Sequence, residues 1–371
     1  MNKRFPLVAV CFAMLLSCSA CNIENPETVE LNLPTVRVNG NIGQMDQIKY
    51  AEEPAELIGG NPWTESLGLT SLPVLEYGLY QNGEFCSDNG FSQEDAIERV
   101  KQVAEVLHLA VDSIDTSSYD PEKMKEYSLV QAVCGDVVIS CSLNGLKNIL
   151  YQENSVELPA GCEFDPQSKE QAEKALDWLV EEYSKPLGIE NPKSFVRKEY
   201  NQSGGYLYNA CVYAQGKNSV DMLLNYAFSL CSFGPELVVD IENDTIHYPG
   251  GLSTITCVGQ LDLMQSKEDY PIISAEAAKE QLLSGNFYSA ADEDESLCPS
   301  DENIACVELV YDTTNSEIRM PYYRFWVSVP QDYIDRHISL FSTELIEAGA
   351  MPYFSFYVPA IQADYLDTTN V

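Results

Sequence analysis

One short pattern occurs three times in this chain, and each time it has the form of a helix start. The copies are Ser92-Gln93-Glu94-Asp95-Ala96, Ser168-Lys169-Glu170-Gln171-Ala172 and Ser274-Ala275-Glu276-Ala277-Ala278. A serine at this position accepts a hydrogen bond from an amide of the first turn, and the glutamate lies favourably against the helix dipole. The pattern therefore predicts helices that begin near residues 92, 168 and 274.

Apolar residues follow each start at helical spacing, which predicts one buried face per helix. The third helix is the shortest, and Gly285 follows it as a C-terminal cap. The predicted buried residues are Ile97, Val100, Ala104, Leu107 and Val111 in the first helix, Ala172, Ala175, Leu176, Leu179 and Tyr183 in the second, and Ala278, Leu282 and Leu283 in the third.

After each helix the hydrophobic period changes to that of strands. Asn144-Gly145 between two such segments is a strong signal for a tight hairpin. A further short helix is expected around Ser342 to Glu347. The predicted strands are 127–134, 137–143 and 146–151 after the first helix, 206–214, 222–232, 237–241 and 245–248 after the second, and 304–311, 322–329 and 353–358 after the third.

These segments predict an α+β fold with about three repeated units, each of one helix followed by an antiparallel β-meander. The helix starts are unequally spaced (168 − 92 = 76 and 274 − 168 = 106), and divergent duplication is the simplest account. The alternative is that three common helix starts occur by coincidence. The predicted segments are a signal peptide at 1–17, a lipidated and flexible tether at 18–43, and α+β units at 44–160, 161–265 and 266–371.

The first residues have the layout of a secretory signal. Lys3 and Arg4 precede an apolar run from Phe5 to Leu16, and small residues and cysteines follow. The run is about half the ~20 residues that a spanning helix needs. Leu15-Leu16-Ser17-Cys18 resembles the lipobox of bacterial lipoproteins.

That resemblance implies cleavage before Cys18, a diacylglyceryl group on its thiol, and a protein anchored at the outer face of the cell membrane in a Gram-positive type of cell. Cys21 is the alternative lipidation site, because Ser19-Ala20 before it is also small. An ordinary cleaved signal with incidental cysteines is a third interpretation. The polar segment after the leader, which has one short alternating piece at Thr35-Val36-Arg37-Val38, is typical of a tether.

A second resemblance covers about the last hundred residues. Ile273-Ser274-Ala275-Glu276-Ala277-Ala278, Val307-Glu308-Leu309-Val310-Tyr311 and Pro321-Tyr322-Tyr323-Arg324-Phe325 are together similar to PepSY-type modules. Such modules occur in exported bacterial proteins, including protease propeptides and membrane regulators. The resemblance implies a binding, inhibitory or regulatory role and supplies no catalytic residues.

The chain is strongly acidic, with 21 basic and 57 acidic residues and a net charge of −36. Loss of Lys3 and Arg4 with the leader makes this 19 − 57 = −38. Such a surface repels phosphate backbones, so nucleic acid is not an expected partner. The expected partners are the membrane, through the lipid anchor, and a protein or peptide at the cell surface.

Nine of the twelve cysteines lie beyond the leader. Cys211 and Cys257 lie in apolar runs, where a buried thiol behaves as a small hydrophobe. Export permits disulfides without requiring them. The best local candidate for a disulfide is Cys298 with Cys306, separated by seven residues (306 − 298 − 1) in an acidic, proline-containing loop.

No motif for catalysis, a metal or a cofactor is found. His108, His247 and His337 are scattered, and the sequence has no His-Glu-x-x-His pair, nucleophile elbow, Walker loop or dinucleotide fingerprint. The acidic run Asp292-Glu293-Asp294-Glu295-Ser296 is better explained as a solvated loop than as a calcium site. A glycosidase acid and base are defined by their spatial separation, so the sequence leaves that class open.

Aromatic residues gather near the C-terminus, where filling a sheet–helix core is the favoured interpretation and an exposed binding surface the alternative. They are Tyr322, Tyr323, Phe325, Trp326, Tyr353, Phe354, Phe356 and Tyr357. Together, these features predict a membrane-anchored lipoprotein with a non-enzymatic binding or regulatory role and no cofactor. The alternatives are a solute-binding lipoprotein of a transporter and a cell-surface hydrolase.

Overall fold

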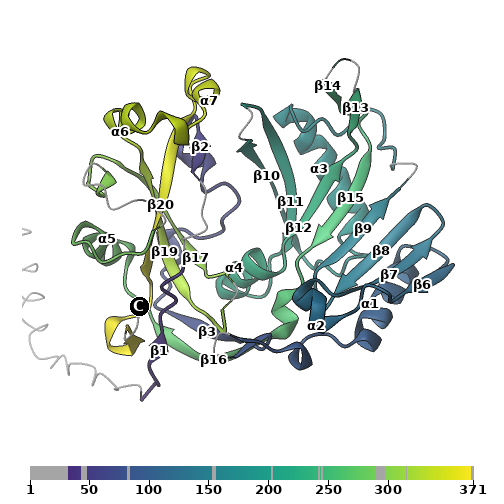
Figure 1. The fold of residues 1–371 in the computed structure, drawn as a ribbon, viewed down its shortest axis with the longest axis horizontal. Coiled ribbons are helices and arrows are strands. Elements are labelled where there is room, and N and C mark those ends of the chain that lie inside the picture. Colours follow the sequence, from purple (N-terminus) through teal and green to yellow (C-terminus); the bar gives the residue numbers. More distant parts are fainter. Residues whose placement is uncertain are drawn as a thin grey trace, which may run out of the picture. The chain divides into compact units, whose positions relative to one another are not determined.

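The computed structural model describes residues 32–42, 48–81, 84–152, 156–201, 204–240, 243, 245–289, 297–314 and 316–368. Every helix and strand of these residues belongs to one unit, Thr35–Val371 (Figure 1). The predicted signal peptide, both candidate lipidation cysteines and the acidic run at 292–296 lie outside the described residues.

An eight-stranded antiparallel sheet is the largest element of the fold (Figure 1). The order of its strands across the sheet is β10-β11-β12-β15-β9-β8-β7-β6. In chain order they are β6 (Ser113–Asp115), β7 (Leu129–Cys134), β8 (Val137–Ser142), β9 (Lys147–Tyr151), β10 (Pro192–Tyr200), β11 (Tyr206–Ala214), β12 (Cys231–Pro235) and β15 (Leu252–Cys257).

Two long helices share one hydrophobic core with this sheet. Helix α1 (Gln93–Val106) packs on β7 and β8, and α3 (Lys169–Tyr183) packs on β10 and β11. Their apolar residues, such as Val100 and Leu179, are fully buried beside Ile139 and Ile255 of the sheet. The burial of these faces explains why the helical spacing of their sequences is so regular.

The sheet consists of two sets of four strands. Along the chain, α1 is followed by β6, β7, β8 and β9, whereas α3 is followed by β10, β11, β12 and β15. The first strand of each set forms one edge of the sheet, and the last strands, β9 and β15, pair with each other in the middle. In both sets, successive strands along the chain therefore run from an edge of the sheet to its middle. The two sets start from opposite edges.

A four-stranded sheet with the order β17-β19-β20-β2 forms the other main part of the unit (Figure 1). Helix α5 (Ala275–Leu283) packs on β20, and α4 (Ser219–Phe228) contacts both β11 of the large sheet and β17. The four strands are β2 (Lys49–Ala51), β17 (Ile304–Tyr311), β19 (Pro321–Ser328) and β20 (Met351–Pro359).

The remaining elements are short, apart from two strands of a three-stranded antiparallel sheet with the order β16-β3-β18. Its strands are β3 (Ser71–Tyr77), β16 (Met264–Pro271) and β18 (Ile318–Arg319). Three two-stranded pairs are β1 (Val36–Arg37) with β21 (Leu366–Asp367), β4 (Tyr80–Gln81) with β5 (Glu84–Phe85), and β13 (Val238–Asp240) with β14 (Thr245–His247). The short helices are α2 (Pro121–Met124), α6 (Gln331–Arg336) and α7 (Thr343–Glu347).

The three predicted helix starts are confirmed. The side chains of Ser92, Ser168 and Ser274 accept hydrogen bonds from the backbone N–H groups of Asp95, Gln171 and Ala277. The predicted hairpin at Asn144-Gly145 is also confirmed, because it joins β8 to β9. Gly145 has φ +85°, and a Cβ atom there would lie 2.5 Å from the carbonyl oxygen of Gly259, so the turn requires glycine.

The coarser fold prediction, a mixture of helices and antiparallel strands, is confirmed. The strands do not form three separate meanders, because those predicted for the first two units belong to one sheet. The C-terminal aromatic cluster fills the core, as expected: Phe325, Trp326, Phe356 and Tyr357 are all less than 5% exposed. Both faces of β19 and β20 are therefore covered.

Several strand predictions need correction. The segment 222–232, predicted as a strand, is mostly helix α4, whose start is capped by the side chain of Asn218. Its apolar residues Val220, Leu223, Leu224 and Ala227 have helical spacing, but a continuous apolar run of this length also resembles a buried strand. Strands β10, β15 and β16 were not predicted.

The predicted tether also needs correction near its end. Residues 35–42 belong to the folded unit, because β1 pairs in parallel with β21 and the side chains of Val36, Val38 and Ile42 are buried. The alternation of Val36 and Val38 is therefore a strand signal. The strand that pairs with it, β21, lies 330 residues further along the chain (366 − 36), and local sequence cannot reveal such a distant partner.

Candidate functional site

A cavity of about 360 Å³ opens where the end of β10 faces β2 and β19. We call it the first cavity. It lies within the size range of small-ligand sites, roughly 300–1,000 Å³. Its lining residues are Ile48, Lys49, Tyr50, Glu56, Leu57, Arg197, Lys198, Glu199, Tyr200, Asn201, Arg324 and Trp326.

The lining of the first cavity is rich in cations. Strand β2 contributes Lys49, β10 contributes Arg197 and Lys198, and β19 contributes Arg324. Four of its twelve lining residues are basic, whereas the whole chain has 21 basic residues among 371. The fold therefore brings four cations together at one point of a strongly acidic protein.

Arg324 is held by a buried carboxylate. Glu308 lies directly opposite it on β17, and the Glu308 side chain is only 2% exposed. Glu308 Oε1 accepts hydrogen bonds from Arg324 Nε at 2.9 Å and from Trp326 Nε1 at 2.8 Å, and Arg324 Nη2 lies 2.8 Å from the same oxygen. Asn61 Nδ2 donates to Glu308 Oε2 at 2.7 Å. This network fixes the position of the Arg324 guanidinium.

Arg197 is held less completely. Its Nη2 pairs with Glu199 Oε1, while the other oxygen of Glu199 accepts a hydrogen bond from Asn209 on β11. Burial acts to lower the pKa of Arg197, but the carboxylate of Glu199 outweighs it and the pKa is raised. The Arg197 side chain is 29% exposed, and its buried Nε has no hydrogen-bond partner among the described residues. Arg197 therefore remains a cation that can accept a further anionic partner.

Lys198 is enclosed by aromatic rings. Its ammonium nitrogen lies 4.8 Å from the ring centroid of Tyr200 and 4.5 Å from that of Tyr206. It also lies 2.7 Å from Glu52 Oε1, which accepts a hydrogen bond from the Tyr200 hydroxyl at 3.0 Å. Burial acts to lower the pKa of Lys198, but the hydrogen bonds to Glu52 and Tyr200 raise it overall. Lys198 thus connects β10 to the segment that follows β2.

Lys49 differs from the other cations because it is exposed and has no ion pair with any residue in the described ranges. Two carboxylates, Glu56 and Glu199, also line the cavity, and two more, Glu52 and Glu308, bind Lys198 and Arg324 from beside it. Arg197 and Lys49 are therefore the cations best placed to bind an anion from solution.

A second cavity of about 290 Å³ shares Arg197 and Arg324 with the first. Unlike the first, it is mainly apolar and aromatic. Its other lining residues are Ile42, Leu223, Tyr226, Ala227, Leu230, Leu309, Val310, Tyr311, Asp312, Thr313, Thr314 and Tyr357. The two arginines therefore lie at the boundary between a basic cavity and an apolar one.

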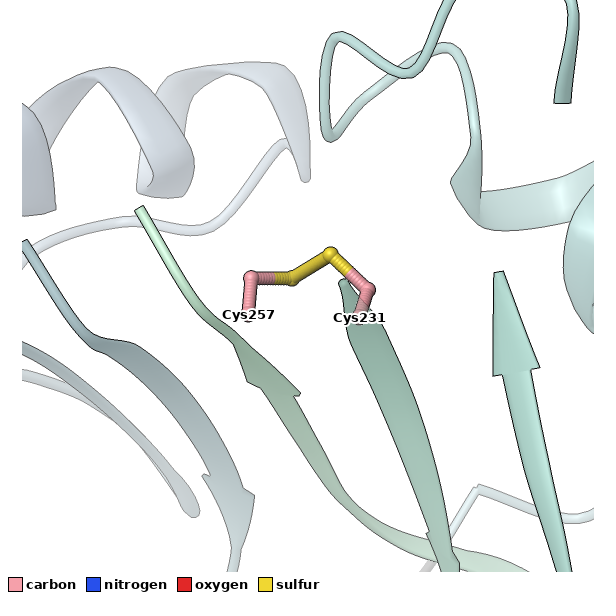
Figure 2. Close-up of a disulfide and its surroundings, with 2 residues drawn as sticks. All are labelled: Cys231 and Cys257. Carbon is pink, nitrogen blue, oxygen red and sulfur yellow. A yellow bond between two sulfur atoms is a disulfide. The ribbon is translucent and has the colours of Figure 1, made fainter. Parts of the chain in front are cut away.

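The predicted disulfide between Cys298 and Cys306 is corrected by the structure, in which both are free thiols. Cys306 lies in β17 with its Sγ 3.5 Å from the carbonyl oxygen of Pro54, whereas Cys298 is exposed. The disulfide joins Cys231 and Cys257 instead, which lie opposite each other on β12 and β15 (Figure 2). Closeness in sequence favoured the wrong pair, since strand register decides which cysteines meet.

Neither a metal centre nor a membrane-spanning helix is found in the described part of the chain. No three of its His, Cys, Asp and Glu side chains are grouped closely enough to hold a metal ion. None of the helices within the described ranges is long and apolar enough to cross a membrane. His247 is exposed on β14, and His337 stacks on Tyr333 with 4.4 Å between ring centroids.

Of the lining residues of the first cavity, the sequence singled out only Arg324 and Trp326, and Trp326 belonged to the aromatic cluster for which a binding surface was the alternative interpretation. One signal could have found β10. Lys193, Arg197 and Lys198 place three basic residues within nine positions of an acidic chain. The strand was missed because its charged residues interrupt the expected alternation of apolar and polar positions.

Comparisons with known proteins give no family. No family model matches this chain, and no curated protein matches it either. Among solved structures, an uncharacterized protein from Eubacterium rectale is 12% identical, with 78% of this chain and 82% of that one covered and a TM-score of 0.27. A likeness this weak supports no conclusion about fold or function.

Proposed function

We propose that this protein is an exported lipoprotein, anchored by Cys18 or Cys21 at the outer face of the cell membrane, that binds an anionic ligand in its first cavity. The role is binding or regulation, and the bound partner is a small molecule or a peptide segment at the cell surface. The leader motif supports the location. The Cys231–Cys257 disulfide agrees with it, since disulfides persist in oxidising compartments.

The observation that carries the binding proposal is the group of four cations in the first cavity of a chain with net charge −36. Solubility needs only the acidic surface, so it does not explain these cations. Cations in a cavity of such a protein are better explained as groups that bind an anion. Arginine binds carboxylate and phosphate oxygens in a bidentate manner. The partly exposed aromatic residues Tyr50 and Tyr200 supply the flat apolar surface that ligand sites commonly use.

The alternatives receive less support from the same residues. A transporter's solute-binding protein requires lobes of alternating strands and helices, whereas both large sheets here are antiparallel. A glycosidase requires two carboxylates that are available to the substrate. Of the two that line the first cavity, Glu199 is already bound to Arg197 and Asn209.

We also propose that the helix-plus-sheet units arose by duplication. In both sets a long helix precedes four strands of the large sheet, with α2 inserted in the first set and α4, β13 and β14 inserted in the second; the shared helix and strand order supports this origin for the first two units. Helix α5 followed by β17, β19 and β20 is the third and most divergent unit, and it carries the resemblance to PepSY-type modules. Sequences of relatives in which residues 92–151 and 168–257 are more alike would support it.

The location is tested by mass spectrometry of the membrane fraction from cells that produce the wild type, Cys18→Ala or Cys21→Ala. We expect one substitution to abolish a diacylglyceryl adduct and to release the protein into the medium. Retention of the protein in the membrane by both variants, without an adduct in the wild type, would contradict the anchor.

The binding proposal is tested with simple anions. We expect acetate, citrate and phosphate to raise the thermal midpoint of the full-length wild type, and this effect to be lost in Arg197→Gln. Arg99→Gln is the matched control, because Arg99 also pairs with one carboxylate, Asp262, and is similarly exposed (25% against 29% for Arg197). If the anions have equal effects on all three proteins, the first cavity is not an anion site.

A further inference from the structure

We infer that the ligand is an amphipathic carboxylate, with its carboxylate at Arg197 and Lys49 and a compact apolar group in the second cavity. This inference rests on the proposed anion site and adds the chemistry of the rest of the ligand. It follows from the position of the two arginines, which line both cavities.

The second cavity is suited to an apolar group. Helix α4 and the residues after it contribute Leu223, Tyr226, Ala227 and Leu230 to its lining, and β17 contributes Leu309 and Val310. The volume of about 290 Å³ equals roughly ten water molecules at about 30 Å³ each, which is enough for an aromatic or branched aliphatic side chain. Burial of such a group from water favours binding.

Two charged groups of the second cavity, Asp312 and Arg324, already have partners. Asp312 accepts hydrogen bonds from Asn39 Nδ2 at 2.7 Å, from the backbone N–H of Thr314 at 2.8 Å and from the Thr314 hydroxyl at 2.6 Å. Arg324 is bound to Glu308. An apolar group in this cavity therefore leaves these polar groups with the partners they already have.

The two arginines have different parts in this arrangement. Arg324 is a fixed part of the cavity lining. It donates to the carboxylate of Glu308, which Trp326 also binds, and its Nη1 donates to the Tyr357 hydroxyl at 3.3 Å. Arg197 is the binding group, because it has one bound carboxylate and its side chain is 29% exposed. Lys49 adds a second positive charge on the opposite side of the first cavity.

Carboxylates with an apolar group come from two sources, the free C-terminus of a peptide and a fatty acid. The test titrates the full-length protein by calorimetry with N-acetylphenylalanine, N-acetylalanine and N-acetylphenylalanine amide, and then with decanoate and decanol. We expect N-acetylphenylalanine to bind about tenfold or more tightly than N-acetylalanine, because its ring is buried. N-acetylphenylalanine amide, which lacks the negative charge, should bind more weakly than N-acetylphenylalanine by a similar factor. A preference for decanoate over N-acetylphenylalanine would identify the source as a fatty acid.

Two variants separate the two halves of the site. Arg197→Gln should weaken the binding of every carboxylate ligand, and Arg99→Gln is its control. Ala227→Phe should fill the second cavity and remove the advantage of N-acetylphenylalanine over N-acetylalanine, while leaving acetate binding intact. Ala277→Phe, at a half-buried position of another helix, α5, is the control for added bulk. Circular dichroism of each variant checks that it folds.

The results distinguish this inference from the proposed function. Binding of acetate and N-acetylphenylalanine with equal affinity, dependent on Arg197 and unaffected by Ala227→Phe, would overturn the amphipathic ligand and retain the anion site. Absence of any Arg197-dependent binding would overturn both. Equal binding of N-acetylphenylalanine and its amide would show that the apolar group alone is recognised, which also contradicts the inference.

Discussion

Arg324 and Arg319 lie five positions apart in the sequence, on strands β19 and β18, and their surroundings are opposite. The Arg324 guanidinium is bound to Glu308, which Trp326 and Asn61 also satisfy. Arg319 is 0% exposed, and its Nε, Nη1 and Nη2 have no hydrogen-bond partner among the described residues. The partly exposed Arg324 has an ion-pair partner in a buried carboxylate, whereas the fully buried Arg319 has no hydrogen-bonded partner among the described residues.

Arg319 is stabilised by weaker interactions. Its guanidinium carbon lies 4.6 Å from the ring centroid of Tyr77. Burial lowers the pKa of Arg319, and the nearby charges of Asp312 and Glu126 oppose this effect. Tyr77, on β3, also has a buried hydroxyl without a hydrogen-bond partner in the described ranges. This region therefore contains four unsatisfied polar atoms close together.

The comparison shows that burial of a charged side chain says little about its contribution to stability. Removing one member of a satisfied buried pair leaves the other charged and unpaired, which is costly. Removing Arg319 breaks no hydrogen bond to a described residue, although it takes a positive charge away from the buried carboxylates of Asp312 and Glu126. The two regions should therefore respond very differently to similar substitutions.

Glu308→Gln should have the largest effect. It removes the charge that Arg324 requires and puts an amide N–H₂ group among donors, so we expect the free energy of unfolding to fall by about 3–5 kcal/mol. Urea denaturation measures the change. The control is Glu76→Gln, since Glu76 pairs with Lys267 at the surface, where both side chains are more than a third exposed, and should cost less than about 1 kcal/mol. Similar losses in the two variants would contradict the role of the buried network.

Trp326→Phe should have an intermediate effect. It keeps most of the buried ring but removes the N–H that donates to Glu308 at 2.8 Å. Hydrogen bonds to charged groups contribute about 1.5–3 kcal/mol, so we expect a loss in that range. The same denaturation experiment tests this value. A loss that persists unchanged in the Glu308→Gln background would show that packing, and not the bond to Glu308, is responsible.

Arg319→Met should cost little. The change removes a buried cation that has no hydrogen bond to any described residue and keeps a long apolar side chain. Since a cation–π contact contributes about 2 kcal/mol when desolvated and burial of the charge opposes it, we expect a net change below about 1 kcal/mol in either direction. A loss as large as that of Glu308→Gln would mean that Arg319 is paired as firmly as Arg324.

Tyr77→Phe should have the smallest effect, or should stabilise the protein slightly, because the buried hydroxyl that it removes makes no hydrogen bond with the described residues. Tyr311→Phe is the matched control. The Tyr311 hydroxyl donates to the carbonyl oxygen of Pro73 at 3.0 Å, and its loss should cost about 1 kcal/mol. If Tyr77→Phe destabilises the protein more than Tyr311→Phe does, the Tyr77 hydroxyl makes a stabilising hydrogen bond, and the prediction is wrong.

The sequence by itself determined the local elements. Ser92, Ser168 and Ser274 cap helices whose buried faces follow from their spacing, and Asn144-Gly145 marks its hairpin, because capping, period and turn geometry depend only on neighbouring residues. Two residues predicted to be buried, Val111 and Leu283, are exposed, and Val111 lies beyond the end of α1. The same spacing failed for α4 and β10, where a continuous apolar run and an interrupted one hid the true period. The lipoprotein leader with Cys18 or Cys21 is a prediction that rests on the sequence alone.

Only the tertiary structure decided which distant residues meet. Cys231 faces Cys257, Glu308 faces Arg324, and Arg197 reaches the cavity that Lys49 lines from a strand almost 150 positions away (197 − 49 = 148). Each meeting depends on strand order and register, which arise from the packing of whole sheets, and a shift of one residue would send every side chain of a strand to the opposite face. The cations of the candidate site are ordinary surface residues in the sequence and become a group only when β2, β10 and β19 come together.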